Sequence, residues 1–166
     1  MTDKRVFETL SENEERSILD RCESVDLAKG EVLFRKGDDS NALYIVRKGE
    51  LTVLDEIPGQ RVFLAGLHEG EIFGEMAFID GRPRSASVQA AKDSQVLMFT
   101  KEEFIRLVIE RPETGARLLI NIGKFLVDRL RRADIALTSM TKSGYTVDEE
   151  ILAKLKGAVS DFRSKV

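Results

Sequence analysis

Between residues 31 and 100, short runs of Val, Ile, Leu and Phe alternate with turn-forming residues, and this spacing constrains the fold more than any other feature. The runs read EVLFR, ALYIVR, ELTVLDE, RVFLAGL, SASVQA and QVLMF, and the separators include KGDDS, KGE, PGQ, HEGE, DGRP and AKDS. Several short strands at even spacing predict an all-β sandwich, roll or barrel. In SASVQA, Ala86, Val88 and Ala90 fall on one face, so we expect small side chains inside the barrel.

Capping patterns predict a helix on each side of this β-rich stretch. Ser11 is followed three residues later by Glu14, and Thr100 is followed by Glu103. A Ser or Thr side chain at the start of a helix accepts from the backbone N–H three residues on, and a Glu at that position bonds back. We therefore expect one helix over about 11–22 and another that opens at Thr100.

Apolar residues recur at helical spacing after Pro112. They predict a long amphipathic helix over about 113–138, and the proline either ends the preceding helix or opens this one. A third capping pattern, Thr146 with Glu149, predicts a last helix over about 147–163.

The composition bounds the class of protein. The hydrophobic fraction is 42% and the charged fraction 33%, which is ordinary for a soluble globular domain. A formal net charge of −3 does not favour binding to a polyanion such as DNA. A single cysteine, Cys22, leaves no internal disulfide and no cysteine metal cluster. No apolar stretch suits a signal peptide or a membrane span, so we expect a cytoplasmic protein.

Residues 73–88, FGEMAFIDGRPRSASV, hold a carboxylate at Glu75 and a guanidinium at Arg84 on either side of an Asp-Gly turn and a proline. The two charges have two interpretations. They form an ordinary surface ion pair, or they are the two poles of a site for a ligand with hydroxyls and a negative charge. A guanidinium fork matches a phosphate, and a short helical turn at EMAF would add backbone N–H groups.

The longer stretch GEIFGEMAFIDGRPRSASV resembles the phosphate-binding cassette of cyclic-nucleotide-binding domains, with a loop length like that of protein kinase A regulatory subunits. Upstream, LYIVRKGELTV and EVLFRKGDDS resemble strand–turn–strand units of the same family. The resemblance covers about residues 6–138. It implies a mainly β domain: an eight-stranded, jelly-roll-like β-roll over about 25–100, flanked by an N-terminal helix and C-terminal helices. Residues 139–166 would form a C-terminal helical extension.

The resemblance also implies roles for single residues. Glu75 would accept from the ribose 2′-hydroxyl, Arg84 would pair with the cyclic phosphate, and Ser85 would meet the same phosphate. Val53 and Leu64 would lie on the β-roll wall near the base. The remaining implied ligand-binding residues line the sugar and phosphate or pack behind them: Phe73, Gly74, Met76, Ala77 and Ala86.

In this family the long C-terminal helix supplies a lid for the base. The resemblance therefore makes Arg129 to Leu137 the candidate lid, although this stretch holds no aromatic residue. Tyr145, just beyond it, is a second candidate to cap the base.

The expected function is that of a sensor, which binds cAMP or cGMP and moves its C-terminal helices. We expect no metal, and no enzyme activity, because no P-loop, dinucleotide glycine pattern or metal spacing is present. A different class remains open: an interaction module of the same fold with a degenerate pocket that binds no nucleotide.

The expected partners are a cyclic nucleotide and either a second copy of the chain, through the apolar stripe over 119–137, or an effector protein. A DNA-binding domain is not expected, because the residues after 138 leave room for one further helix and not for a helix-turn-helix module.

Overall fold

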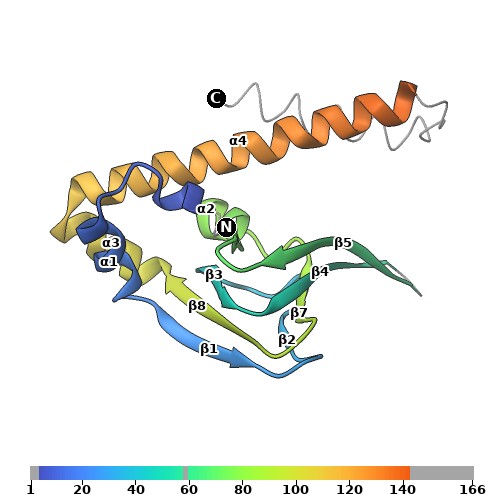
Figure 1. Cartoon of the computed structure of the whole chain (residues 1–166), viewed down its shortest axis with the longest axis horizontal. Helices are drawn as coiled ribbons and strands as arrows, with labels where there is room; N and C mark the ends of the chain where they lie inside the picture. Colours follow the sequence, from blue (N-terminus) through green and yellow to red (C-terminus); the bar gives the residue numbers. More distant parts are fainter. Residues whose placement is uncertain (1–3, 58–59, 143–166) are drawn as a thin grey trace. The chain divides into compact units, whose positions relative to one another are not determined.

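The computed structural model describes residues 4–57 and 60–142 of the 166-residue chain (Figure 1). The chain divides into two compact units, one ending at Gly123 and one beginning at Lys124, and each is described by itself. The predicted last helix, its Thr146–Glu149 capping pattern and Tyr145 lie outside the described residues. The predicted domain boundaries stay a prediction.

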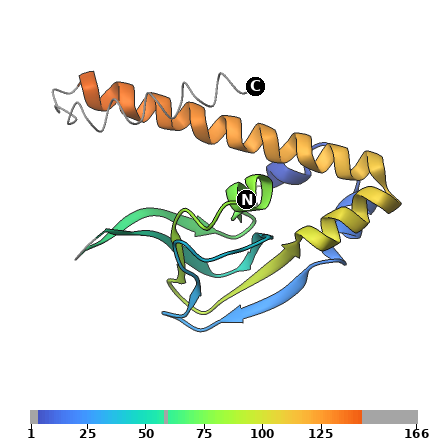
Figure 2. The same cartoon turned by 180° about the vertical axis from the view of Figure 1, so that it is seen from behind.

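Eight strands in the described part of the first unit form two antiparallel sheets of four, and eight is the number of strands that the resemblance implied. The first sheet has the order β1 (Glu23–Leu27), β8 (Ser94–Thr100), β3 (Ala42–Lys48) and β6 (Ile72–Phe73). The second has the order β2 (Val32–Phe34), β7 (Ser87–Ala90), β4 (Glu50–Ile57) and β5 (Gln60–His68). Figure 1 and Figure 2 show β1 and β8 side by side, with β8 leading directly into a helix.

The core lies between the inner faces of the two sheets. Leu51 of β4 and Val96 of β8 are 0% exposed, as expected where alternate side chains of two sheets interdigitate. Val88 and Ala90 belong to this core, as the alternation in SASVQA predicted. The other buried residues of this cluster come from four strands, β1, β3, β5 and β6. They are Leu27, Ala42, Tyr44, Val46, Leu67 and Phe73.

Helices cover the outer face of the first sheet. On β3 and β8 the residues that alternate with the core residues are buried as well, among them Leu43 and Phe99. Phe78 of α2 (Glu75–Asp80) lies with its ring centroid 6.4 Å from that of Phe99 and 5.6 Å from that of Phe104 in α3 (Lys101–Glu110). These contacts fix α2 and α3 against β8 through aromatic packing.

The remaining described helices are η1 (Lys4–Phe7), α1 (Glu12–Leu19) and α4 (Pro112–Lys142). The capping box at Ser11 and Glu14 is confirmed, with both reciprocal hydrogen bonds formed. The Thr100 hydroxyl accepts from the Glu103 N–H at 3.2 Å and opens α3. Helix α1 ends earlier than predicted, and α4 starts at Pro112 itself and extends beyond residue 138.

The pattern of apolar runs missed two strands. β1 has the sequence ESVDL, in which only Val25 and Leu27 face the core, and β6 has two residues. The run over 85–90 is strand only from Ser87 onwards, because the residues before it belong to the loop described below. Within the described residues, no helix has both the length and the apolar character that a bilayer crossing requires.

Candidate ligand-binding site

Gly74 joins β6 to α2 in a conformation that other residues rarely adopt. Its φ is 78° and its ψ is 8°, in the left-handed region. A Cβ atom added here would lie 2.6 Å from Nη1 of Arg84 and 3.2 Å from the carbonyl oxygen of Ala42. Both the backbone angle and the close approach therefore require glycine, and the missing side chain is what lets a guanidinium lie against this turn.

Arg84 is 3% exposed and is held by oxygen atoms that carry no formal charge. Its Nη1 donates to the Gly74 carbonyl at 3.0 Å, and its Nη2 donates to the Ala42 carbonyl at 2.9 Å and to the Ser40 hydroxyl. Nε is also buried, and none of the described residues supplies it with a hydrogen-bond partner. A buried N–H without an acceptor is rare in folded proteins, so this group is suited to an acceptor from a ligand.

Aromatic rings hold the guanidinium from one side. The Cζ atom of Arg84 lies 4.2 Å from the ring centroid of Phe34 and 5.3 Å from that of Tyr44. Tyr44 in turn stacks on Phe73, with centroids 5.2 Å apart. Ring faces attract a cation and also restrict its rotation, so β2, β3 and β6 together fix the plane of the guanidinium.

The main chain of Arg84 is fixed by the turn between β2 and β3. Its N–H donates to the Asp38 carbonyl at 2.9 Å, and its carbonyl accepts from the Gly37 N–H at 2.8 Å. Burial lowers the pKa of Arg84, while the nearby Tyr44, Glu75 and Asp38 act in the opposite direction. The guanidinium nevertheless stays charged at neutral pH, because an arginine pKa begins far above that range.

Glu75, the other charged pole, is the first residue of α2 and is 2% exposed. An acidic side chain at this end of a helix is stabilised by the helix dipole. Because Glu75 and Arg84 are both almost completely buried, the interpretation as an ordinary surface ion pair is wrong.

The loop between the two poles is formed by the predicted Asp-Gly turn. The Gly81 N–H donates to the Ala77 carbonyl at 3.0 Å and ends α2, and the Arg82 N–H donates to the Asp80 carboxylate at 3.0 Å. Gly81 has a φ of 69°. This turn brings the chain back, so that Arg84 returns to the start of α2.

Other predicted site residues divide between buried and exposed positions. Ala77 and Ala86 are buried. Met76 is 52% exposed, and its sulfur lies 3.8 Å from the hydroxyl oxygen of the exposed Ser85. The turn therefore carries small buried side chains beside exposed ones.

Val53 and Leu64 lie on the β4–β5 hairpin. Val53 is half-buried against the core and pairs with Val88 of β7, which leads out of the cassette loop. Leu64 is 52% exposed and sits at a register shift, since Val53 pairs with Ala65 and the next pair skips one residue of β5. The structure therefore places Val53 beside β7 and Leu64 on a bulge.

Sequence reasoning missed the four residues that hold the guanidinium from outside the cassette: Phe34, Ser40, Ala42 and Tyr44. They lie about forty or more positions before Arg84 in the chain, and the two that bond to it are 44 and 42 positions away. The signals that pointed toward them were the strand–turn–strand stretches EVLFRKGDDS, which contains Phe34 and Ser40, and LYIVRKGELTV, which contains Tyr44.

The candidate lid over Arg129 to Leu137 lies on α4 in the second unit. There the Arg129 guanidinium lies 5.7 Å from the ring centroid of Phe125. Across residues 4–57 and 60–142, no group of three or more His, Cys, Asp or Glu side chains is placed to hold a metal ion.

Comparison with known proteins decides the family. Residues 24–111 match the family model described as the cyclic nucleotide-binding domain, and the match includes both sheets and the Gly74–Arg84 loop. The chain belongs to this family. The resemblance seen in the cassette residues is thereby confirmed, and so is the fold, an eight-stranded roll with flanking helices.

Three relatives show how the family likeness extends. The cyclic AMP receptor protein of Thermus thermophilus is 35% identical over 126 residues, which are 69% of this chain and 56% of that protein. The cAMP-dependent protein kinase regulatory subunit of Blastocladiella emersonii is 33% identical over 105 residues, 62% of this chain and 26% of that protein. The crystal structure of the Thermus thermophilus catabolite activator protein matches with a TM-score of 0.73 and 31% identity, over 82% of this chain and 63% of that one.

This member of the cyclic nucleotide-binding domain family therefore spans only part of each relative. It covers little more than half of the bacterial receptor protein and about a quarter of the kinase subunit.

Proposed function

We propose that this chain binds a cyclic nucleotide, cAMP or cGMP, between Glu75 and Arg84, and that it acts as a sensor rather than as a catalyst. The observation that carries the proposal is the state of Arg84. Its charge is buried, its hydrogen bonds go to neutral oxygens, and its Nε has no acceptor within the described chain. A buried cation that lacks a fully matched set of acceptors favours an anionic ligand.

Each part of the site formed by Gly74, Glu75, Arg84 and the first turn of α2 has a role in binding a cyclic nucleotide. Arg84 presents a planar, oriented donor group to the phosphate. Glu75 offers a carboxylate acceptor to a ribose hydroxyl. The first turn of α2 leaves backbone N–H groups without partners inside the helix, and the Gly74 turn lets a ligand approach the backbone closely. The names of the relatives, a cyclic AMP receptor protein and a cAMP-dependent kinase subunit, support the same ligand class.

We propose that the cassette reports ligand binding to the C-terminal helices through Lys101, the first residue of α3. Its ammonium donates to the Phe78 carbonyl in α2 at 3.0 Å, and its N–H donates to the Asn41 carbonyl at 2.8 Å. Asn41 lies between Ser40 and Ala42, which both bond to Arg84. A ligand that shifts Arg84 or α2 therefore acts on the start of α3 through groups in direct contact, which is a population shift when the two arrangements bind ligand unequally.

A second candidate function is an interaction module that binds no nucleotide. The observation that favours it is that Arg84 already bonds to three protein oxygens, so a phosphate must compete with them. For either function, a second copy of the chain bound through α4, or an effector protein, is the proposed partner.

Calorimetric titration with cAMP and with cGMP separates the two candidates. We expect one or both to bind, and Arg84→Ala to weaken binding by about 10-fold to 150-fold, which corresponds to about 1.5–3 kcal/mol for a hydrogen-bonded charged group. The matched control is Arg82→Ala in the same loop, because the Arg82 side chain is 80% exposed. Its affinity should stay within about twofold of the wild type.

Thermal unfolding gives an independent measurement. A nucleotide present at about 100 times its Kd stabilises the folded chain by about 2.7 kcal/mol. If neither nucleotide produces heat or raises Tm at millimolar concentration, the interaction module is the better description.

A further inference from the structure

Helices α3 and α4 meet at a single residue that is not helical. Arg111 has a φ of −141° and a ψ of 72°, and α4 begins immediately after it at Pro112. A residue before proline is driven out of the α region. We call this junction at Arg111 and Pro112 the elbow. It is tightly packed, because a Cβ atom on Gly115 would lie 2.6 Å from Cγ2 of Val108. Any movement of α4 relative to α3 has to pass through this elbow.

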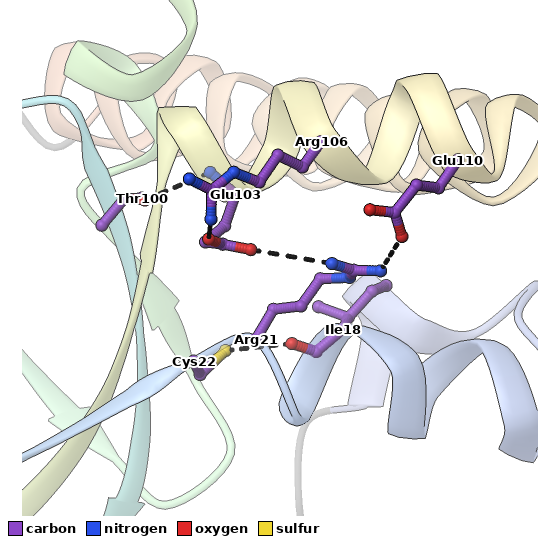
Figure 3. A network of polar contacts seen from close by, with 7 residues as sticks. All are labelled: Ile18, Arg21, Cys22, Thr100, Glu103, Arg106 and Glu110. Carbon is purple, nitrogen blue, oxygen red and sulfur yellow. Dashed lines mark hydrogen bonds and ion pairs between the residues drawn. The ribbon is translucent and has the colours of Figure 1, made fainter.

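The N-terminal segment, residues 6–21, contacts α3 on one side of the elbow. Arg21 lies just after α1, and its Nη2 donates to the Glu110 carboxylate at 2.5 Å. Its Nη1 lies 3.7 Å from the Glu103 carboxylate. Figure 3 shows the Arg21 side chain, just after the blue helix α1, pointing toward the carboxylates of Glu103 and Glu110 on α3. One residue of the N-terminal segment thus contacts both the first turn and the last residue of α3.

The same segment contacts α4 on the other side of the elbow. Glu14 of α1 accepts from the buried Thr114 hydroxyl at 3.1 Å and lies 3.6 Å from the Arg117 guanidinium. Asn121 is 1% exposed and is bonded through both ends of its amide. Its Nδ2 donates to the Val6 carbonyl at 2.8 Å, and its Oδ1 accepts from the Thr9 hydroxyl at 3.0 Å.

We propose that residues 6–21 form a clamp across the elbow, and that Arg21, Glu14 and Asn121 are positioning residues that set how readily α3 and α4 change their angle. The contacts lie in series: α3 is joined to the segment by Arg21, and the segment is joined to α4 by Glu14 and Asn121. If the angle changes, one of the two sets of contacts has to break. The part of this inference that concerns ligand response rests on the proposed function, and the part that concerns the elbow does not.

Amide hydrogen exchange at the elbow tests the clamp without any ligand. The reporters are the N–H groups of Arg111 and Gly115, which donate to the carbonyls of Leu107 and Arg111. We expect Arg21→Met and Asn121→Leu each to speed this exchange by about fivefold or more, the lower end of common coupling effects. If Asn121→Leu does not fold, Thr9→Val removes one of its partners at an exposed position.

Non-additivity distinguishes a clamp from separate local contacts. In a series connection, breaking the second link changes little, so Arg21→Met combined with Asn121→Leu should match the larger single effect within about twofold. A double variant whose effect is the product of the two single effects overturns the proposal. The matched control is Arg106→Met: Arg106 pairs with the same Glu103 at 2.5 Å but lies on α3 itself and does not cross the elbow.

Nucleotide titration then measures the coupling to the ligand site. Arg21→Met and Asn121→Leu should shift the Kd for the bound nucleotide in the same direction by about fivefold, and the double variant should shift it no further. Opposite directions, or shifts no larger than that of Arg106→Met, overturn the proposed coupling. If no nucleotide binds to any variant, the proposed function fails, while the exchange measurement still decides whether the clamp exists.

Discussion

Arg84 and Arg21 are both largely buried arginines, and neither has an acceptor for Nε within the described residues. Their other partners differ. Arg84 bonds to two carbonyl oxygens and a hydroxyl, whereas Arg21 pairs with the carboxylates of Glu103 and Glu110. Carboxylates bond directly to Arg21, whereas the hydrogen bonds of Arg84 go to neutral oxygens, and Glu75 and Asp38 act on it electrostatically. The difference teaches that an arginine which holds a protein together is recognised by charged partners, and one suited to an anionic ligand by neutral ones.

Replacing each arginine with lysine should produce the largest contrast between the two. Arg84→Lys keeps the charge but loses Nε and the planar fork, so we expect nucleotide affinity to fall by about 10-fold to 150-fold. Arg21→Lys keeps an ion pair with two carboxylates, and affinity should change by no more than about twofold. Calorimetric titration checks both, and equal losses would remove the distinction between the two sites.

The glycines at the two ends of α2 test whether the close approach of Arg84 matters. Gly74 and Gly81 both have positive φ, but a Cβ atom on Gly81 meets nothing within 4 Å. Gly81→Ala should destabilise the fold by about 1 kcal/mol, because only the backbone is strained. Gly74→Ala should destabilise it by about 2 kcal/mol or more, since the Arg84 guanidinium has to move as well. Urea unfolding measures both, and equal values would mean that the guanidinium adjusts freely.

Added salt should weaken the ion pairs of Arg21 with Glu103 and Glu110, and it should leave the hydrogen bonds of the buried Arg84 unchanged. The Arg21 side chain is 20% exposed and that of Glu110 is 55% exposed, so the pair contributes less than about 1 kcal/mol and is screened by added salt. Arg21→Met should lower the free energy of unfolding at low salt, and the difference from wild type should shrink in 1 M NaCl, about ten times the ionic strength at which the Debye length is 10 Å. A difference that is unaffected by salt would point to lost packing.

Cys22, directly after Arg21, has no effect on stability through its ionisation at neutral pH and gives a pH dependence above it. Burial raises the pKa of its thiol to about 12, while the pKa of a cysteine in the unfolded chain is about 8.5. The folded state therefore keeps a proton that the unfolded state loses, so stability is unaffected at low pH and falls as pH rises from about 9 toward 12. Unfolding measured against pH should show this component in the wild type, and Cys22→Ala should lack it. A component of equal size in the variant would assign it to other groups.

The fold and much of the cassette could be predicted because their signals are local. Ser11 and Thr100 cap helices through hydrogen bonds that span three residues, and the turn at Asp80 and Gly81 is equally short in range. By contrast, β1 was missed because its alternation of ESVDL shows only two inward apolar residues, and β6 because it is two residues long. Edge or very short strands carry too little periodic signal to be recognised alone.

The sequence by itself determined which residues carry charge at the cassette and where its turn lies. Its apolar runs predicted a sandwich, roll or barrel, and its resemblance to the family implied the roll. Only the tertiary structure decided what surrounds those charges. Two hydrogen-bond partners of Arg84, Ser40 before β3 and Ala42 at its start, lie 44 and 42 residues earlier. The hydrogen bond from Asn121 to Val6 and that from Arg21 to Glu110 join residues 115 and 89 positions apart. The physical reason is that local hydrogen bonding sets turns and caps, whereas long-range neighbours are chosen by the collective packing of two sheets and their helices.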